Sequence, residues 1–189
     1  MKSYLFILVL ISTSILSAQE KTLLTANLGL VQHAGTGFGS SFSTVRFVTD
    51  RLAISLSVGY YKWNNGGDTQ GYVNYNRNRK IINYSLIPFS VGGRYYFGHD
   101  NINPYLGLEW GLNVRKRNYI FEYADFSNPS SPKIDKWSKL YSNPFASFGL
   151  EFGVILGLID NFNFVANMRS IWGDGTAFTF FNTGLVYSI

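Results

Sequence analysis

The stretch that decides the fold is Leu52-Ala53-Ile54-Ser55-Leu56-Ser57-Val58-Gly59-Tyr60-Tyr61. Large apolar side chains occupy every second position, and small or polar side chains occupy most positions between them. Side chains at i and i+2 share a face only in a β-strand, so the pattern predicts a strand with one apolar face and one lean, partly polar face. The lean face is too small and polar to line the dry core of a soluble sandwich.

The same alternation recurs along the chain and predicts strands at residues 22–33, 42–49, 52–62, 81–97, 104–114, 145–158, 162–172 and 177–189. Short connections at 50–51, 98–103 and 159–161 alternate with connections at 34–41, 63–80, 115–143 and 173–176 that we expect to be longer or variable. This alternation is typical of barrels with short periplasmic turns and longer outer loops. The sequence therefore predicts an all-β fold, an eight-stranded antiparallel up-and-down transmembrane β-barrel with its apolar face toward lipid.

The first 18 residues have the features of a secretory signal peptide. Lys2 precedes an apolar run over residues 4–15, and Leu16-Ser17-Ala18 provides a small-residue exit. The run is shorter than the about 20 apolar residues of a spanning helix. We therefore expect residues 1–18 to be removed and residues 19–189 to form one domain. The chain has no cysteine, which suits passage through an oxidising periplasm.

Aromatic residues are expected near both ends of the strands, where their amphipathic rings favour the headgroup level of a bilayer. The residues predicted to form these two girdles are Tyr60, Trp63, Tyr95, Phe97, Trp172 and Tyr187.

Over essentially its whole mature length the chain resembles the small eight-stranded outer-membrane barrels of Gram-negative bacteria, the OmpA and OmpX type. The last strand resembles their assembly signal, with Phe181, Leu185, Tyr187 and Ile189 at alternate positions. The segment 87–97 also looks like a strand common in such barrels. The resemblance implies an outer-membrane location after cleavage of the signal peptide, contact with the barrel-assembly machinery through the C-terminal strand, and a monomer.

Five long charged side chains are predicted to point inward and fill the lumen, because an eight-stranded barrel is only wide enough for side chains. They are Arg46, Arg94, Glu109, Glu151 and Arg169. Turn lengths predict that Arg46 faces Ser55, that Glu151 faces Arg169, and that Arg94 and Glu109 come near each other. We expect an internal ion-pair network, since an unpaired buried charge is expensive. The alternative is a narrow ion-conducting path.

The two longest predicted loops are cationic. Residues 62–80 carry four Lys or Arg against one carboxylate, and residues 115–143 carry six against three. Lipopolysaccharide has phosphorylated headgroups that attract such charge, although a simply solvated loop face is an equally good interpretation. The predicted glycolipid contacts are Lys62, Arg77, Arg79, Lys80, Arg115, Lys116 and Arg117. Export and the barrel pattern argue against nucleic acid as a partner.

The sequence favours a structural or surface-interaction role over catalysis. A lipid A-modifying outer-membrane enzyme is the alternative, but His33 and His99 are the only histidines and neither has an evident nucleophile and orienting carboxylate. No motif for a metal or cofactor is present, and none is expected. A secreted lipocalin-like carrier is a further alternative, whose barrel would place apolar residues inside and polar residues outside.

Overall fold

The computed structural model describes residues 21–33, 35–73, 76–98, 101–125, 133–159 and 161–189. For residues 65–73, 76–81, 122–125 and 133–134 only the backbone is described. The predicted signal peptide, residues 1–18, lies outside the described residues. Within the described ranges, no helix is long and apolar enough to cross a membrane.

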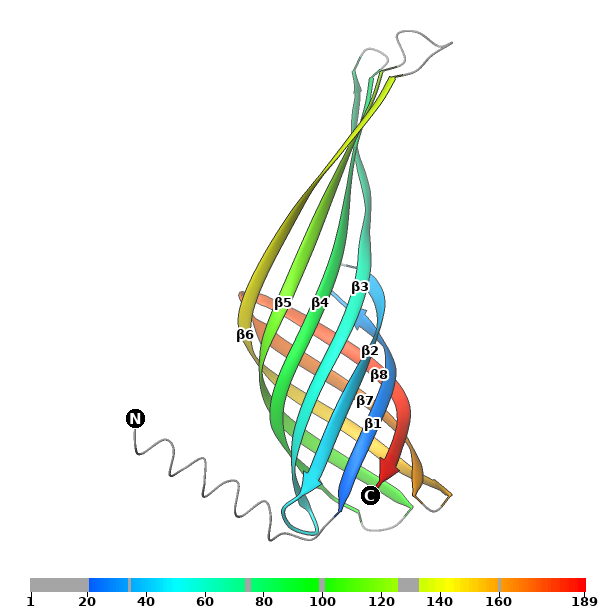
Figure 1. Cartoon of the computed structure of the whole chain (residues 1–189), viewed down its shortest axis with the longest axis vertical. Helices are drawn as coiled ribbons and strands as arrows, with labels where there is room; N and C mark the ends of the chain where they lie inside the picture. The colour runs from blue at the N-terminus through cyan, green and yellow to red at the C-terminus, as the bar shows by residue number, and fades with distance from the viewer. Residues whose placement is uncertain (1–20, 34, 74–75, 99–100, 126–132, 160) are drawn as a thin grey trace, which may run out of the picture.

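Eight antiparallel strands close into a barrel in which each strand pairs with its neighbours in sequence and β1 pairs with β8 (Figure 1). This confirms the predicted fold. The strands are β1 Thr22–Gln32, β2 Thr36–Phe47, β3 Leu52–Val73, β4 Asn76–Tyr96, β5 Ile102–Asp125, β6 Lys133–Ile159, β7 Phe162–Gly173 and β8 Thr176–Ser188.

Side chains alternate across the barrel wall as the sequence predicts. In β5, Leu108 and Trp110 are 44% and 58% exposed, whereas Glu109 between them is 7% exposed. Apolar residues therefore cover the outside, which is the opposite of the polarity of a soluble carrier barrel. Five of the six predicted girdle aromatics are exposed on this outer wall. The prediction for Trp63 is wrong, because its side chain is buried on the inner face and stacks on Tyr84.

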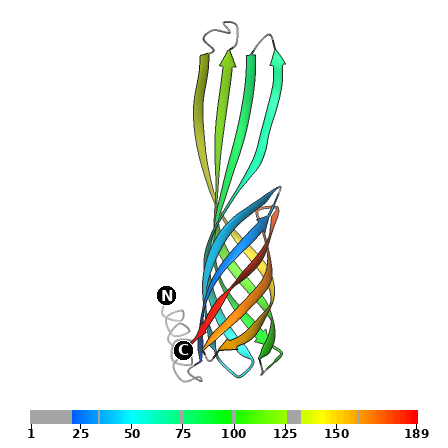
Figure 2. The same ribbon diagram turned by 90° about the vertical axis from the view of Figure 1, so that its right-hand side faces the viewer.

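Four strands continue well beyond the other four. Figure 2 shows β3, β4, β5 and β6 rising from one end of the barrel as a twisted sheet. The β3–β4 register runs to Val73↔Asn76 and the β5–β6 register to Asp125↔Lys133. The prediction that residues 63–80 and 115–143 are loops is therefore wrong, as is most of the loop predicted at 34–41, because β2 begins at Thr36. We call the end of the barrel from which this sheet rises the mouth.

The interior holds two layers of apolar side chains. The first lies near the chain termini and comprises Leu23, Val45, Phe47, Ala53, Tyr96, Tyr105, Ile155, Val165 and Val186. The second lies near the mouth and comprises Val31, Tyr61, Trp63, Leu86, Phe145, Ile171, Phe178 and Phe180. The interior is thus bulkier than its sequence pattern predicts. Glycines make this possible: a Cβ on Gly153 would lie 2.5 Å from Cζ of Tyr105.

The connection between β7 and β8 is a two-residue turn at Asp174-Gly175. Both residues have positive φ, 52° for Asp174 and 64° for Gly175, and Gly173 pairs with Thr176. Two positive φ angles define the hairpin turn whose twist matches the flanking strands. Asn143 Nδ2 donates a 2.9 Å hydrogen bond to Asp174 Oδ2, which ties this turn to β6.

Gly175→Ala is expected to destabilise the barrel by about 1 kcal/mol, because an L side chain is strained in the left-handed region. No atom would crowd the added Cβ within 4 Å, so the effect reports backbone strain alone. The free energy of unfolding in detergent micelles measures it. Gly175→Asn, which tolerates positive φ, is the matched control and should cost less. Equal losses in the two variants would contradict this explanation.

Candidate functional site

Four of the five charged residues predicted for the lumen lie there, between the two apolar layers. Arg94 Nε and Nη2 donate hydrogen bonds of 2.8 and 3.1 Å to the two carboxylate oxygens of Glu151. Tyr105 donates a third bond, 3.0 Å long, to Glu151 Oε1. Arg94, Glu109, Glu151 and Arg169 are each no more than 7% exposed. Every oxygen of Glu151 is therefore engaged by a donor on the inner wall.

The second ion pair joins Arg169 and Glu109. Arg169 Nε donates to Glu109 Oε1, and Ser90 donates a 2.7 Å hydrogen bond to Glu109 Oε2. Glu151 and Arg169 are directly opposite each other in the β6–β7 register, as the turn length predicts, yet each is paired elsewhere. Both ion pairs cross over a glycine: Gly107 lies between Arg94 and Glu151, and Gly149 lies opposite Glu109.

The prediction that Arg46 faces inward is wrong. Val45 and Phe47 on either side of it are 0% and 5% exposed, so Arg46 lies on the outer face of β2. It pairs with Ile54 rather than Ser55, because the β2–β3 loop has three residues between Val48 and Leu52. At the end of a strand an arginine can reach interfacial water while its stem covers apolar surface.

At the mouth, the outward-facing residues of β3 to β6 change from mostly apolar in one row to polar in the next row along the strands. Lys62, Ser85, Lys116 and Ser142 are in register across the four strands. Tyr60, Ile87, Val114 and Pro144 precede this row on the same face, and Asn64, Asn83, Asn118 and Leu140 follow it. We call the surface formed by the Lys62 row and the Asn64 row, in which Leu140 is the one apolar residue, the outer-face groove; its cavity has a volume of about 430 Å³. Lys62 Nζ also lies 5.6 Å from the ring centroid of Tyr60.

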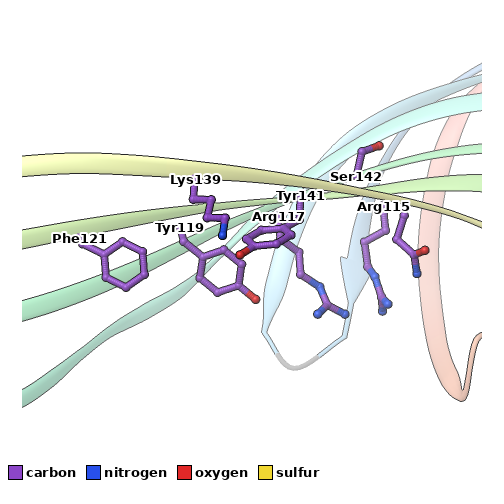
Figure 3. A pocket seen from close by; sticks show the side chains of 8 residues that line it. Arg115, Arg117, Tyr119, Phe121, Lys139, Tyr141 and Ser142 are labelled. Carbon is purple, nitrogen blue, oxygen red and sulfur yellow. The ribbon is translucent and has the colours of Figure 1, made fainter.

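The opposite face of the same sheet continues the lumen wall and carries a second groove. We call it the inner-face strip, comprising Arg115, Arg117, Tyr119 and Phe121 of β5 with Trp137, Lys139, Tyr141 and Asn143 of β6. Figure 3 shows the guanidinium groups of Arg115 and Arg117 on the same side as the Tyr119 ring, whereas Ser142 points to the other side. The groove along the strip has a volume of about 580 Å³.

The predicted glycolipid contacts are thus divided between two faces. Lys62 and Lys116 lie together in the outer-face groove, whereas Arg115 and Arg117 lie on the inner-face strip. Arg115 is only 4% exposed, and its Nη2 lies 2.8 Å from Asp174 Oδ2. The side chains of Arg77, Arg79 and Lys80 lie outside the described residues, although their backbone belongs to β4.

Solved structures of several bacterial barrels have this architecture. Neisserial surface protein A is 15% identical with a TM-score of 0.56, and the alignment covers 88% of this chain and 95% of that one. Ail, the attachment invasion locus protein of Yersinia pestis, is 12% identical with a TM-score of 0.52 over 90% and 99% of the two chains. The outer membrane protein OprG from Pseudomonas aeruginosa is 11% identical with a TM-score of 0.51 over 91% and 97%. This chain has the fold of the small outer-membrane β-barrels.

The likeness is one of fold, because these identities are low. No protein-family model matches the sequence of this outer-membrane-type barrel, and no curated protein matches it. Its site therefore has to be understood from its own residues.

Sequence reasoning missed several polar and aromatic partners in the lumen. Ser90 and Tyr105 complete the two ion pairs, and Tyr61 donates a 2.9 Å hydrogen bond to Asn182 Oδ1. The inward position of Tyr105 could have been predicted, because it lies two residues before Gly107 and four before Glu109 and so shares their face of the strand. Within the described ranges, no group of three or more His, Cys, Asp or Glu side chains could hold a metal ion.

Proposed function

We propose that the protein is an integral outer-membrane barrel that acts through its outer surface, and that the outer-face groove binds the phosphorylated headgroup of lipopolysaccharide. The observation that carries this proposal is the position of Lys62 and Lys116 directly above an exposed apolar wall. A lipid whose acyl chains cover that wall has its headgroup at the level of the two ammonium groups.

The arrangement of the groove supports a phosphate ligand. Lys62 and Lys116 both pair with Ser85, one from each side, so their backbones are two strand spacings, roughly 10 Å, apart. Asn64, Asn83 and Asn118 supply amide donors in the next row. Two cations separated by donors can hold two charged groups of one headgroup at once.

A filled lumen is part of the same proposal. Two buried ion pairs lie between two apolar layers, which opposes a continuous water path and therefore the ion-conducting alternative. The proposed function does not include catalysis. His33 Nδ1 lies 2.9 Å from the carbonyl oxygen of Ala177, and its ring packs on Phe178 and Trp63, so its described contacts include no nucleophile or carboxylate. His99 lies outside the described residues.

The C-terminal strand fits the proposed recognition by the barrel-assembly machinery. Phe181, Leu185 and Tyr187 are 45%, 56% and 40% exposed on the outer wall of β8. This apolar row is therefore accessible at the point where β1 and β8 close the barrel.

Replacing either lysine by glutamine is expected to weaken binding of phosphorylated lipopolysaccharide about fivefold, because one cation near a charged surface contributes about 1 kcal/mol. The measurement is a titration of intrinsic tryptophan fluorescence of the purified protein in detergent. Lys62→Gln/Lys116→Gln should show the sum of the two effects. Lys21→Gln, which removes a charge at the opposite end of the barrel, is the matched control.

Dephosphorylated lipopolysaccharide separates charge from acyl-chain binding. It should bind the wild-type protein and the double variant equally, since the lysines then have no phosphate to contact. Unchanged affinity of the double variant for the phosphorylated form would overturn the proposal.

A further inference from the structure

The inner-face strip is a second surface, on the side of the sheet opposite the outer-face groove. Its register is regular: Arg115 pairs with Asn143, Arg117 with Tyr141, Tyr119 with Lys139, and Phe121 with Trp137. The two arginines lie closest to the mouth, Lys139 is level with Tyr119, and the Phe121–Trp137 pair lies farthest along the strands. The end of the strip at the mouth is therefore basic, and its far end is aromatic.

The rings of the strip form an ordered platform. The Tyr119 and Tyr141 centroids are 5.4 Å apart with an edge-to-face angle of 86°. Phe121 stacks on Trp137 at 5.4 Å with an angle of 13°. Trp137 is 55% exposed and Tyr141 is 46% exposed. In a soluble core such rings would be covered, but here Tyr119, Phe121 and Tyr141 line an open groove.

The charges of the strip are not balanced locally. Arg115, Arg117 and Lys139 line the groove, and none of its eight lining residues is a carboxylate. A side-chain hydrogen bond with the Tyr141 hydroxyl raises the pKa of Lys139. Asp174, at the base of the strip, accepts hydrogen bonds from Arg115 Nη2 and from Asn143 Nδ2, and Nη2 is the one Arg115 atom that it is described to contact.

Arg115 has donors without acceptors. Its Nε and Nη1 atoms are buried and have no hydrogen-bond partner. A buried guanidinium with unpaired N–H groups is costly, and an anion is the ligand that satisfies them best. Phe145 lies beside this group, with its ring centroid 5.7 Å from Cζ of Arg115. The base of the strip thus combines the unsatisfied donors of buried Arg115, beside an apolar wall, with the more exposed Arg117 in the next row.

We propose that the inner-face strip binds an acidic glycan, with a carboxylate, sulfate or phosphate group of the chain at Arg115 and Arg117 and its sugar rings on Tyr119 and Tyr141. Sugar rings present flat C–H faces that pack on aromatic rings, while their hydroxyl groups use the polar ends of tyrosine side chains. An open groove along two strands accommodates a linear chain.

Two other classes of polymer fit the strip less well. An extended peptide adds to a sheet edge through main-chain hydrogen bonds, whereas the groove lies on the face of the sheet, over side chains of β5 and β6 that are paired with each other. A single-stranded nucleic acid needs cations that follow its phosphates along the whole groove, and here the two arginines gather at one end.

The experiment uses the full-length purified protein in detergent with five probes. Oligogalacturonate and dextran sulfate test carboxylate and sulfate glycans, neutral dextran tests charge, and polyglutamate and oligothymidylate test the other two polymers. We expect at least one acidic glycan to bind and dextran to bind far more weakly. Arg117→Gln should weaken that binding about tenfold, since a hydrogen bond to a charged group is lost. Tyr119→Ala should weaken it about fivefold.

Lys21→Gln is the matched control, because it removes one charge at the end of the barrel opposite the mouth, outside both grooves. It should leave glycan affinity within about twofold of wild type. The melting temperature of each variant verifies folding. The proposal is overturned if no acidic glycan binds, if dextran binds equally well, if polyglutamate or oligothymidylate binds more tightly, or if Lys21→Gln weakens glycan binding as much as Arg117→Gln does. Because Arg117 and Tyr119 line only the inner-face strip, their substitution leaves the outer-face groove unchanged and separates this result from that of the lipopolysaccharide experiment.

Discussion

Glu151→Gln is expected to destabilise the barrel by about 3–5 kcal/mol, the cost of leaving a buried charge without its partner. The substitution keeps the shape of the side chain but removes the charge that Arg94 faces, and it weakens the acceptor of the Tyr105 hydroxyl. The free energy of unfolding by urea in detergent micelles measures the loss. The temperature at which the folded band disappears on a gel provides a second readout.

A double-mutant cycle identifies the partner of Glu151. Arg94→Gln combined with Glu151→Gln should cost at least about 1 kcal/mol less than the two single losses added together. Arg169→Gln combined with Glu151→Gln should come closer to the sum, because Arg169 is paired with Glu109. A larger coupling for Glu151 with Arg169 would show that the direct cross-strand neighbour is the true partner.

Gly153→Val is the second substitution with a large expected effect. Its Cβ would lie 2.5 to 2.7 Å from three atoms of the Tyr105 side chain, which is buried and held by Glu151. Overpacking of this kind costs about 1–3 kcal/mol, and more where the ring has no space to move. We expect a lower yield of heat-modifiable, folded protein and a lower midpoint of unfolding.

Gly93→Val is its matched control. Gly93 lies on the outer wall of β4, and a Cβ there would have as its closest neighbour the Ala53 carbonyl oxygen, 3.9 Å away. The added side chain would face lipid, so stability should stay within about 0.5 kcal/mol of wild type. Similar losses at the two glycines would mean that strand propensity, rather than the space around Tyr105, sets the cost.

The sequence predicts the barrel well because every membrane-spanning strand has one wall facing lipid and one facing the lumen. Leu108 and Trp110 against Glu109 illustrate the resulting alternation, which survives without any alignment. The same signal disappears in the sheet beyond the mouth, where one face carries the mostly polar outer-face groove and the other mixes basic and aromatic side chains. Asn64-Asn65-Gly66-Gly67 is typical of a loop by composition, yet the chain there continues as β3 with a register shift between Asn65 and Asp68.

The ion pairs of the lumen were predictable in kind but not in detail. Parity places Arg94, Glu109, Glu151 and Arg169 inside, and turn length correctly predicts that Glu151 faces Arg169. Long side chains do not have to bond to the residue opposite, because a glycine lets them reach one strand farther. Around Arg46, apolar residues occupy both even and odd positions, so the sequence pattern did not decide which face of β2 points inward.

The sheet beyond the mouth exposes an unpaired edge, formed by β6. Where β6 outlasts β7, its edge has no strand beside it, and bare edges invite pairing with another chain. Charged residues such as Asp135 and Lys139 lie along this edge, and Pro144, near the barrel, has no amide hydrogen to donate. We therefore expect these residues to oppose edge-to-edge pairing between neighbouring copies of the protruding sheet.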